Sequence, residues 1–299
     1  MSYDLYFYKK KTSNLTESQI ADYLTFKLSP SSLSGNKQWF VDDKLTEVYY
    51  SIDHNEPKTD DESIKLFESL DDYENTHFTF SLNYIRPDFF GRGPFDFFIK
   101  RLIIDLDLYV LNPQSITNSN HPIKPKENEL YENWSQINEI QSANLFYKNG
   151  LEYYPLDKSN EFYNYNSNIF RLQADLNEIY SIPKLYLYKK KYDGQLITIC
   201  EWVECTPSVF PSADYFILIK KYEEKSKLVE EVGLISSDTF NERFESFITN
   251  FKFENCKIIH PKKAGKAKDI FNATKIEHNL SDFAVRVPID KLVNVKPNE

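Results

Sequence analysis

The chain has 299 residues, of which 41% are hydrophobic and 16% aromatic, enough to build sizeable cores and to exclude disorder over the whole length. Its 45 acidic residues outnumber the 36 basic ones, and the resulting net charge of −9 disfavours broad electrostatic binding to nucleic acid or to an anionic membrane. With only 7 glycines and 3 cysteines, the sequence also excludes most glycine-rich nucleotide loops and a disulfide framework.

The first half of the chain alternates aromatic strand patterns with helical ones. Residues 77–85 give the clearest strand, because apolar and polar side chains alternate there with period two. Residues 95–106 carry apolar side chains at helical spacing, and Pro94 suits a first turn. The predicted elements are, in chain order, a strand over 3–8, a helix capped by Thr16 and ended by Pro30, a hairpin over 38–41 and 45–52, the strand over 77–85, the helix over 95–106 and a strand over 108–111.

An Asn- and Pro-rich connection over 112–125 leads into a similar mixture of elements. These are, in chain order, a helix around 130–146, a mostly helical stretch over 162–180, strands over 185–188, 196–203 and 215–221, a helix over 239–251, and strand-like segments near 258–259 and 283–287. We therefore predict an α+β fold with a mainly antiparallel sheet and helices on one face. It is expected in two similar-sized parts, an N-terminal domain of residues 1–150 and a C-terminal domain of residues 151–299.

Charged residues on either side of the predicted 95–106 helix are the first candidates for chemistry. Asp105 and Asp107 place two carboxylates at a helix-to-strand junction, where they could bind a divalent cation or pair as acid and base. Solvated surface charges are the simpler interpretation of both. Arg86 and Arg92 lie before the helix and could bind an anion, whereas a rigid turn that aims the helix at the sheet explains the glycines and prolines there without a ligand.

The histidines and cysteines show no spacing typical of a metal site. Neither the HExxH pattern nor any close histidine pair occurs, so a histidine site would have to be assembled wholly by tertiary folding. Cys200 and Cys205 lack a second cysteine pair. We therefore predict no catalytic residue, no cofactor and no metal ion. The histidines are His54, His77, His121, His260 and His278.

Location and partners are also constrained by the sequence. No secretory leader pattern opens the chain, and no apolar run approaches the roughly 20 residues that span a bilayer. The one basic stretch, residues 257–268, has no neighbouring aromatic platform on which bases could stack. We expect a cytoplasmic protein with neither a membrane nor a nucleic-acid partner.

Three segments carry a resemblance to known proteins: residues 1–9, Met-Ser-Tyr-Asp-Leu-Tyr-Phe-Tyr-Lys; residues 80–91; and Leu111-Asn-Pro-Gln114. Over roughly residues 1–140 the chain resembles poorly characterised bacterial cytosolic proteins that look like the immunity proteins of polymorphic or contact-delivered toxin systems. The resemblance implies a protein that neutralises a cognate toxin, encoded by an adjacent gene, through direct non-catalytic binding. It carries over no catalytic residue.

Such a protein needs an interface, and aromatic residues are enriched at interfaces. The candidates for partner binding are Trp39, Tyr49, Trp134 and Tyr153, although each type is also common in cores. Two alternatives to the immunity function stay open. One is an enzyme whose site is assembled by folding near Arg86, Asp105 and Asp107, and the other is a scaffold or regulatory protein with the same composition.

Overall fold

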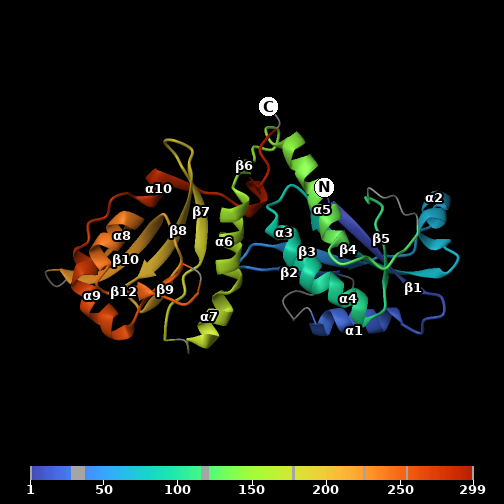
Figure 1. The fold of residues 1–299 in the computed structure, drawn as a ribbon, viewed down its shortest axis with the longest axis horizontal. Coiled ribbons are helices and arrows are strands. Elements are labelled where there is room, and N and C mark those ends of the chain that lie inside the picture. Colours follow the sequence, from blue (N-terminus) through green and yellow to red (C-terminus); the bar gives the residue numbers. More distant parts are fainter. Residues whose placement is uncertain are drawn as a thin grey trace. The chain divides into compact units, whose positions relative to one another are not determined.

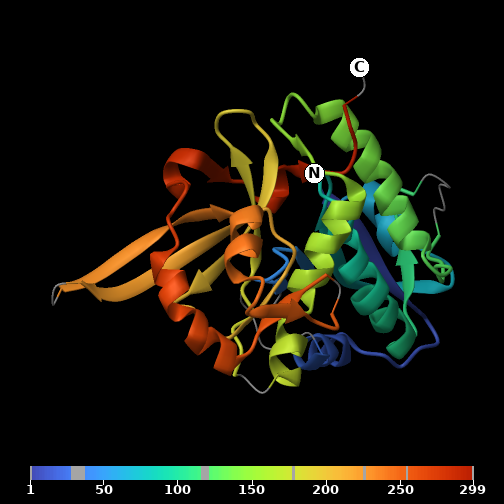
Figure 2. The ribbon, with the colours of Figure 1, turned by 60° about the vertical axis from the view of Figure 1, so that its left-hand side comes forward.

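The computed structural model describes residues 2–27, 38–115, 121–176, 179–224, 227–253 and 255–297. The chain forms two compact units, one of Met1–Ser159 with Ile289–Glu299 and the other of Asn160–Pro288 (Figures 1 and 2). Both combine helices with mainly antiparallel sheets, which confirms the predicted α+β class. The division into domains 1–150 and 151–299 stays a prediction. Within the described ranges, no helix has the length and apolar character needed to cross a bilayer.

The first unit is built on a five-stranded sheet in the order β2-β3-β4-β1-β5, in which every neighbouring pair is antiparallel. The predicted alternation holds in β4, where Phe78, Phe80 and Leu82 are all buried. That strand begins at Tyr73, four residues before the predicted start. The five strands are β1 (Ser2–Lys10), β2 (Gln38–Asp42), β3 (Tyr49–His54), β4 (Tyr73–Asn83) and β5 (Tyr109–Leu111).

The same unit contains several helices and a short parallel pair of strands. A continuous helical run over 89–105 packs with α5 in the core. The last residues of the chain return to this unit, where β15 pairs with β6. The elements are α1 (Glu17–Lys27), α2 (Asp61–Ser63), η1 (Ile64–Glu68), α3 (Phe89–Gly93), η2 (Pro94–Ile99), α4 (Lys100–Asp105), α5 (Glu129–Leu145), β6 (Glu152–Tyr153), η3 (Ile289–Lys291) and β15 (Leu292–Val293).

The rigid turn suggested for residues 86–94 is shorter in the structure, because the chain bends over 84–88 and residues 89–94 are already helical. Gly91 lies inside α3, with its backbone against the ring of the fully buried Trp134 of α5. A Cβ atom there would lie well inside 3.0 Å of the ring, a separation that real Cβ atoms do not show. Glycine is therefore needed for close helix packing, where the sequence had suggested a turn.

The second unit has a five-stranded sheet in the order β11-β10-β8-β7-β14, in which only β8 and β10 are parallel, and a smaller sheet in the order β12-β13-β9. The predicted helix over 239–251 ends at Phe244, and Ile248 begins a strand. The elements are α6 (Leu156–Ser167), within which the unit begins, α7 (Ile169–Asp175), β7 (Leu185–Lys190), β8 (Leu196–Val203), β9 (Ser208–Phe210), β10 (Tyr215–Glu224), β11 (Lys227–Ser236), α8 (Ser237–Phe244), β12 (Ile248–Asn250), β13 (Lys257–Ile259), α9 (Pro261–Ala273), α10 (Leu280–Phe283) and β14 (Ala284–Arg286).

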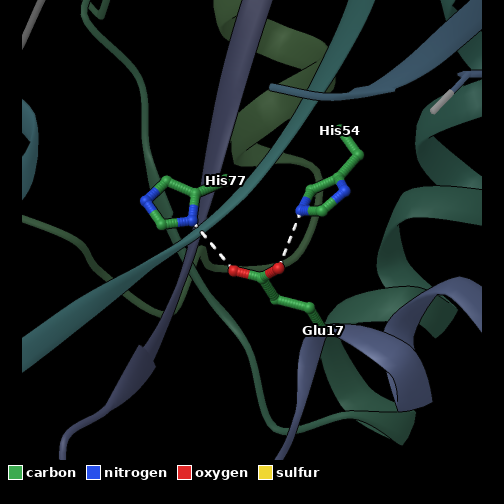
Figure 3. A group of neighbouring side chains, drawn as sticks. All are labelled: Glu17, His54 and His77. Carbon is green, nitrogen blue, oxygen red and sulfur yellow. Dashed lines mark hydrogen bonds and ion pairs between the residues drawn. The ribbon is translucent and has the colours of Figure 1, made fainter. Parts of the chain in front are cut away.

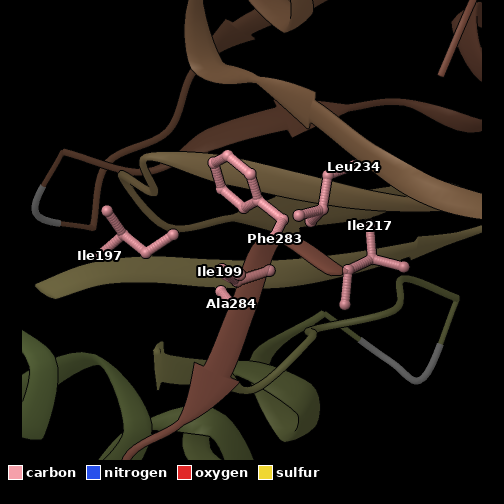
Figure 4. Packing of buried hydrophobic residues seen from close by; sticks show 6 residues of the cluster. All are labelled: Ile197, Ile199, Ile217, Leu234, Phe283 and Ala284. Atoms are coloured by element: carbon pink, nitrogen blue, oxygen red, sulfur yellow. The ribbon is translucent and has the colours of Figure 1, made fainter. Parts of the chain in front are cut away.

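Two apolar clusters hold the second unit together. Figure 4 shows the first, in which Phe283 and Ala284 pack against aliphatic side chains of β8, β10 and β11. In the second, the buried ring of Trp202 meets four phenylalanine rings edge-on at centroid distances of 4.8–5.7 Å. Edge-to-face contacts of this kind add to the stabilisation from burial alone.

Two glycines of the second unit are expected to respond oppositely to alanine. At Gly233 in β11, a Cβ would collide with Ile276 and with the carbonyl of His278, so Gly233→Ala should lower the free energy of unfolding by about 1–3 kcal/mol. At the exposed Gly265 in α9, no neighbouring atom lies within 4 Å, and Gly265→Ala should raise it by about 0.5–1 kcal/mol. Urea unfolding of both variants checks this pair, and effects of the same sign would contradict the packing described.

Candidate functional site

The four aromatic residues predicted for partner binding lie at different depths in the first unit. Trp134 is fully buried and Trp39 is 6% exposed, so both tryptophans pack in the core. Tyr49 and Tyr153 are half-buried. The Tyr49 hydroxyl accepts hydrogen bonds from Arg86 Nη2 at 2.7 Å and from Asn83 Nδ2 at 3.0 Å. Partner contact by any of the four stays a prediction.

The charged residues considered for an enzyme have separate partners. The Arg86 guanidinium donates to the Ile85 carbonyl at 2.8 Å as well as to Tyr49, and so holds the chain between β4 and α3. The Asp105 carboxylate accepts from the Tyr23 hydroxyl. Asp107 pairs at 2.6 Å with Lys124, and this hydrogen bond holds the pKa of Asp107 below its usual range. These contacts do not bring the three residues together.

A groove lined by aromatic and charged side chains lies between α1, the strands β2 and β3 and the helical run over 93–105, and we call it the aromatic groove. Its volume is about 500 Å³. On its helical side, the lining residue Phe97 is 66% exposed. Ile104, which is not a lining residue but precedes the lining residue Asp105, is exposed to the same degree. Phe26, on α1, is 88% exposed. The lining residues are Tyr23, Lys27, Val41, Tyr50, Gly93, Phe97, Phe98, Arg101 and Asp105.

The aromatic groove is held in shape by contacts on its walls and floor. The Tyr50 ring packs against Phe98 of the groove and against Phe80 of the core, at centroid distances of 5.5 and 5.6 Å. The Tyr23 hydroxyl donates to Asp105 Oδ2 at 2.6 Å and so ties α1 to α4. Burial and this carboxylate raise the pKa of Tyr23 to about 12, so the phenol stays a neutral donor at ordinary pH.

A second arrangement of side chains, which we call the histidine cluster, joins three elements of the same unit (Figure 3). Each oxygen of the Glu17 carboxylate lies 3.0 Å from a different imidazole, one from His77 Nδ1 and the other from His54 Nε2. Although partial burial acts in the opposite direction, the hydrogen bond with His77 and the charge of His54 lower the pKa of Glu17. Glu17 also lines a neighbouring cavity of about 240 Å³.

Local sequence signals place Glu17 and His54 in the cluster. Thr16 and Gln19 form a capping box, in which Thr16 Oγ1 accepts from the Gln19 amide at 3.3 Å and Gln19 Oε1 accepts from the Thr16 amide at 2.9 Å. The predicted Thr16 cap is thereby confirmed, and it fixes Glu17 as the first residue of α1. His54 ends β3 opposite Phe78 of β4, and its ring stacks on the Phe78 ring at 4.5 Å.

A bulge in β4 orients the His77 side chain toward Glu17. Tyr6 and Tyr8 of β1 pair with Thr79 and Asn75, so three residues of β4 lie opposite one of β1. Within the bulge His77 has a φ of 61°, in the left-handed region. Its amide donates to Asn75 Oδ1 at 2.8 Å, and its carbonyl accepts from the Asn55 amide at 2.8 Å. These hydrogen bonds stabilise a backbone conformation that is otherwise unfavourable for histidine.

A second carboxylate fixes the far side of the His77 ring. His77 Nε2 lies 3.3 Å from Glu68 Oε2. The other oxygen of Glu68 accepts from the Lys58 amide at 3.2 Å and from Asn75 Nδ2 at 3.4 Å. His77 therefore stands between two carboxylates, each supplied by a different helix.

Sequence reasoning did not identify the histidine cluster. It did show that a histidine site could arise only through tertiary folding, and the pairing of β3 with β4 is the step that places His54 beside His77. The hairpin predicted over 38–52 corresponds to the pairing of β2 with β3, which does not involve His77. A prediction that His54 lies next to residues 77–79 in the sheet would have required the β3–β4 register.

No protein-family model, no curated protein and no solved structure matches the chain. The resemblance to immunity proteins therefore stays a prediction.

Proposed function

We propose that this protein is an immunity protein that binds a cognate bacterial toxin and neutralises it without catalysis. The observation that carries the proposal is the aromatic groove, a hollow of about 500 Å³ in which the large apolar side chain of Phe97 remains 66% exposed. Exposed aromatic side chains beside charged and hydrogen-bonding groups are typical of protein-binding sites.

The composition of the groove suits a protein surface as its occupant. Phe97 and Phe98 offer apolar contact, while Lys27, Arg101 and Asp105 in the same lining can form hydrogen bonds with polar groups of a partner. The net charge of −9 would speed the approach of a basic toxin, such as one that acts on nucleic acid. A rigid groove also loses little conformational entropy on binding, because Tyr50 and Tyr23 are already held in place.

The proposal is tested by purifying the tagged protein together with the product of the adjacent reading frame. We expect a stable 1:1 complex that survives size-exclusion chromatography. The absence of a complex between the two purified products would contradict the proposal and would favour the scaffold or enzyme alternatives.

A further inference from the structure

We propose that Glu17, His54 and His77 form a binding site for one divalent transition-metal ion of the zinc class. This inference is independent of the proposed toxin binding, because the histidine cluster and the aromatic groove share no residue. The argument rests on the positions of the donor atoms, on their chemistry and on the contacts that hold them.

The donor atoms are already gathered around a common point. One ligand atom from each of the three side chains lies within 4.8 Å of the other two, and both imidazole nitrogens are 3.0 Å from the carboxylate. Around a tetrahedral zinc ion with bonds of about 2.0–2.2 Å, ligand atoms are separated by about 3.3–3.6 Å. Small side-chain rotations would therefore suffice, with an ion taking the place of the protons that now lie between the nitrogens and Glu17.

The chemistry of the donors selects the class of ion. Two imidazole nitrogens and one carboxylate oxygen are a set that zinc and its neighbours bind with three protein ligands and an open fourth position. Magnesium and calcium prefer ligand sets made of oxygen atoms, and this cluster does not provide one. The half-exposed side chain of Glu17 leaves the cluster accessible to an entering ion.

The contacts around His77 are those expected of a metal ligand. Glu68 on Nε2 would hold the tautomer in which Nδ1 offers its lone pair to the ion, and such carboxylate–histidine–metal arrangements are common around metal sites. Glu68 is itself held by the Lys58 amide and by Asn75. With both histidines neutral, the carboxylates of Glu17 and Glu68 would balance the two positive charges of the ion.

The backbone at His77 adds an independent observation. A left-handed φ at a non-glycine residue is unfavourable, and it occurs here in a bulge that turns the imidazole toward Glu17. The same feature supplies a useful variant. Asparagine tolerates the left-handed region, so His77→Asn should keep the bulge while removing the imidazole.

The test is calorimetric titration of the tag-free, metal-stripped protein with Zn²⁺, repeated with Co²⁺, whose visible spectrum reports tetrahedral coordination. We expect one equivalent to bind, with an affinity reduced about 100-fold or more in His77→Asn and His54→Gln, and about 10–100-fold in Glu68→Gln. The matched control is His121→Gln, an exposed histidine of the same unit, which should bind as the wild type does. Far-ultraviolet circular dichroism and thermal unfolding establish that each variant is folded.

Two results would overturn the proposal. Failure of the wild-type protein to bind a stoichiometric Zn²⁺ or Co²⁺ ion would show that the cluster is a network of ion pairs. Equal binding by the wild type and a folded His77→Asn variant would place the ion elsewhere in the chain. The cysteines Cys200, Cys205 and Cys256 are buried, so we expect them not to compete for an added ion in the folded protein.

Discussion

Replacing Trp134 by alanine is expected to lower the free energy of unfolding by about 3–5 kcal/mol, the range found for large aromatic residues removed from cores. The indole is fully buried, its ring lies 6.3 Å from those of Phe95 and Tyr131, and its Nε1 donates to the Asn83 carbonyl at 3.3 Å. Alanine would leave a cavity between α5 and the helical run and would remove the indole donor from the Asn83 carbonyl. Equilibrium unfolding in urea measures the loss, and a change below about 1 kcal/mol would contradict a core role for this residue.

Gly91 gives this prediction a matched second variant. Gly91→Ala alone should cost about 1–3 kcal/mol, because the new Cβ would collide with the Trp134 ring. In a Trp134→Ala background the same change should cost little, since the ring that causes the collision is absent. The two changes would therefore be non-additive in a double-mutant cycle, whereas additive effects would show that Gly91 and Trp134 do not interact.

Replacing Phe97 by glutamate is expected to weaken the complex with the adjacent gene product by about 2 kcal/mol or more, roughly 30-fold in Kd. Phe97 is the most exposed of the phenylalanines that line the aromatic groove, and a carboxylate there would have to be desolvated against an apolar contact. Because the side chain is solvent-exposed, the free protein should keep its stability within about 0.5 kcal/mol.

Phe170→Glu is the control for the groove variant. Phe170 lies on α7 of the second unit and is 75% exposed, so the substitution adds the same charge to a similarly exposed phenylalanine outside the groove. Its complex should have the wild-type affinity by calorimetry or surface plasmon resonance. Equal weakening by both substitutions would point to a general effect of charge, and no weakening by Phe97→Glu would place the interface elsewhere.

The sequence predicted those elements that have strong local signals. The alternation over 77–85 and the Thr16 cap each depend only on residues close together in the sequence. The structure has both the strand and the cap. Elements that depend on distant contacts were missed. The helical segment 89–94 contains two glycines and a proline, and its Gly91 packs against the ring of Trp134, which lies about 40 residues further along the sequence.

The sites were harder to predict than the fold for the same reason. Glu17, His54 and His77 are brought together by a capping box, a strand pairing and a bulge, and only the first of these can be read from adjacent residues. Trp134 is a partner-binding candidate because of its residue type, and tryptophan is common in both cores and interfaces. In the structure Trp134 is fully buried, which places it in the core. The exposure of Phe97 agrees with the sequence pattern, because Phe97 lies off the stripe of apolar residues at helical spacing in the 95–106 helix. The groove beside Phe97 could not be predicted, because α1 and the strands β2 and β3 that also line it come from other parts of the chain.

The central claim, neutralisation of a toxin by direct binding, is tested most directly by co-expression. The adjacent gene product is expressed alone, with the wild-type protein, and with the Phe97→Glu variant, while growth of the host is measured. The account predicts that the adjacent product is toxic alone, that the wild-type protein restores growth, and that Phe97→Glu does so less well at equal protein level. Toxicity that persists with the wild-type protein present would contradict it.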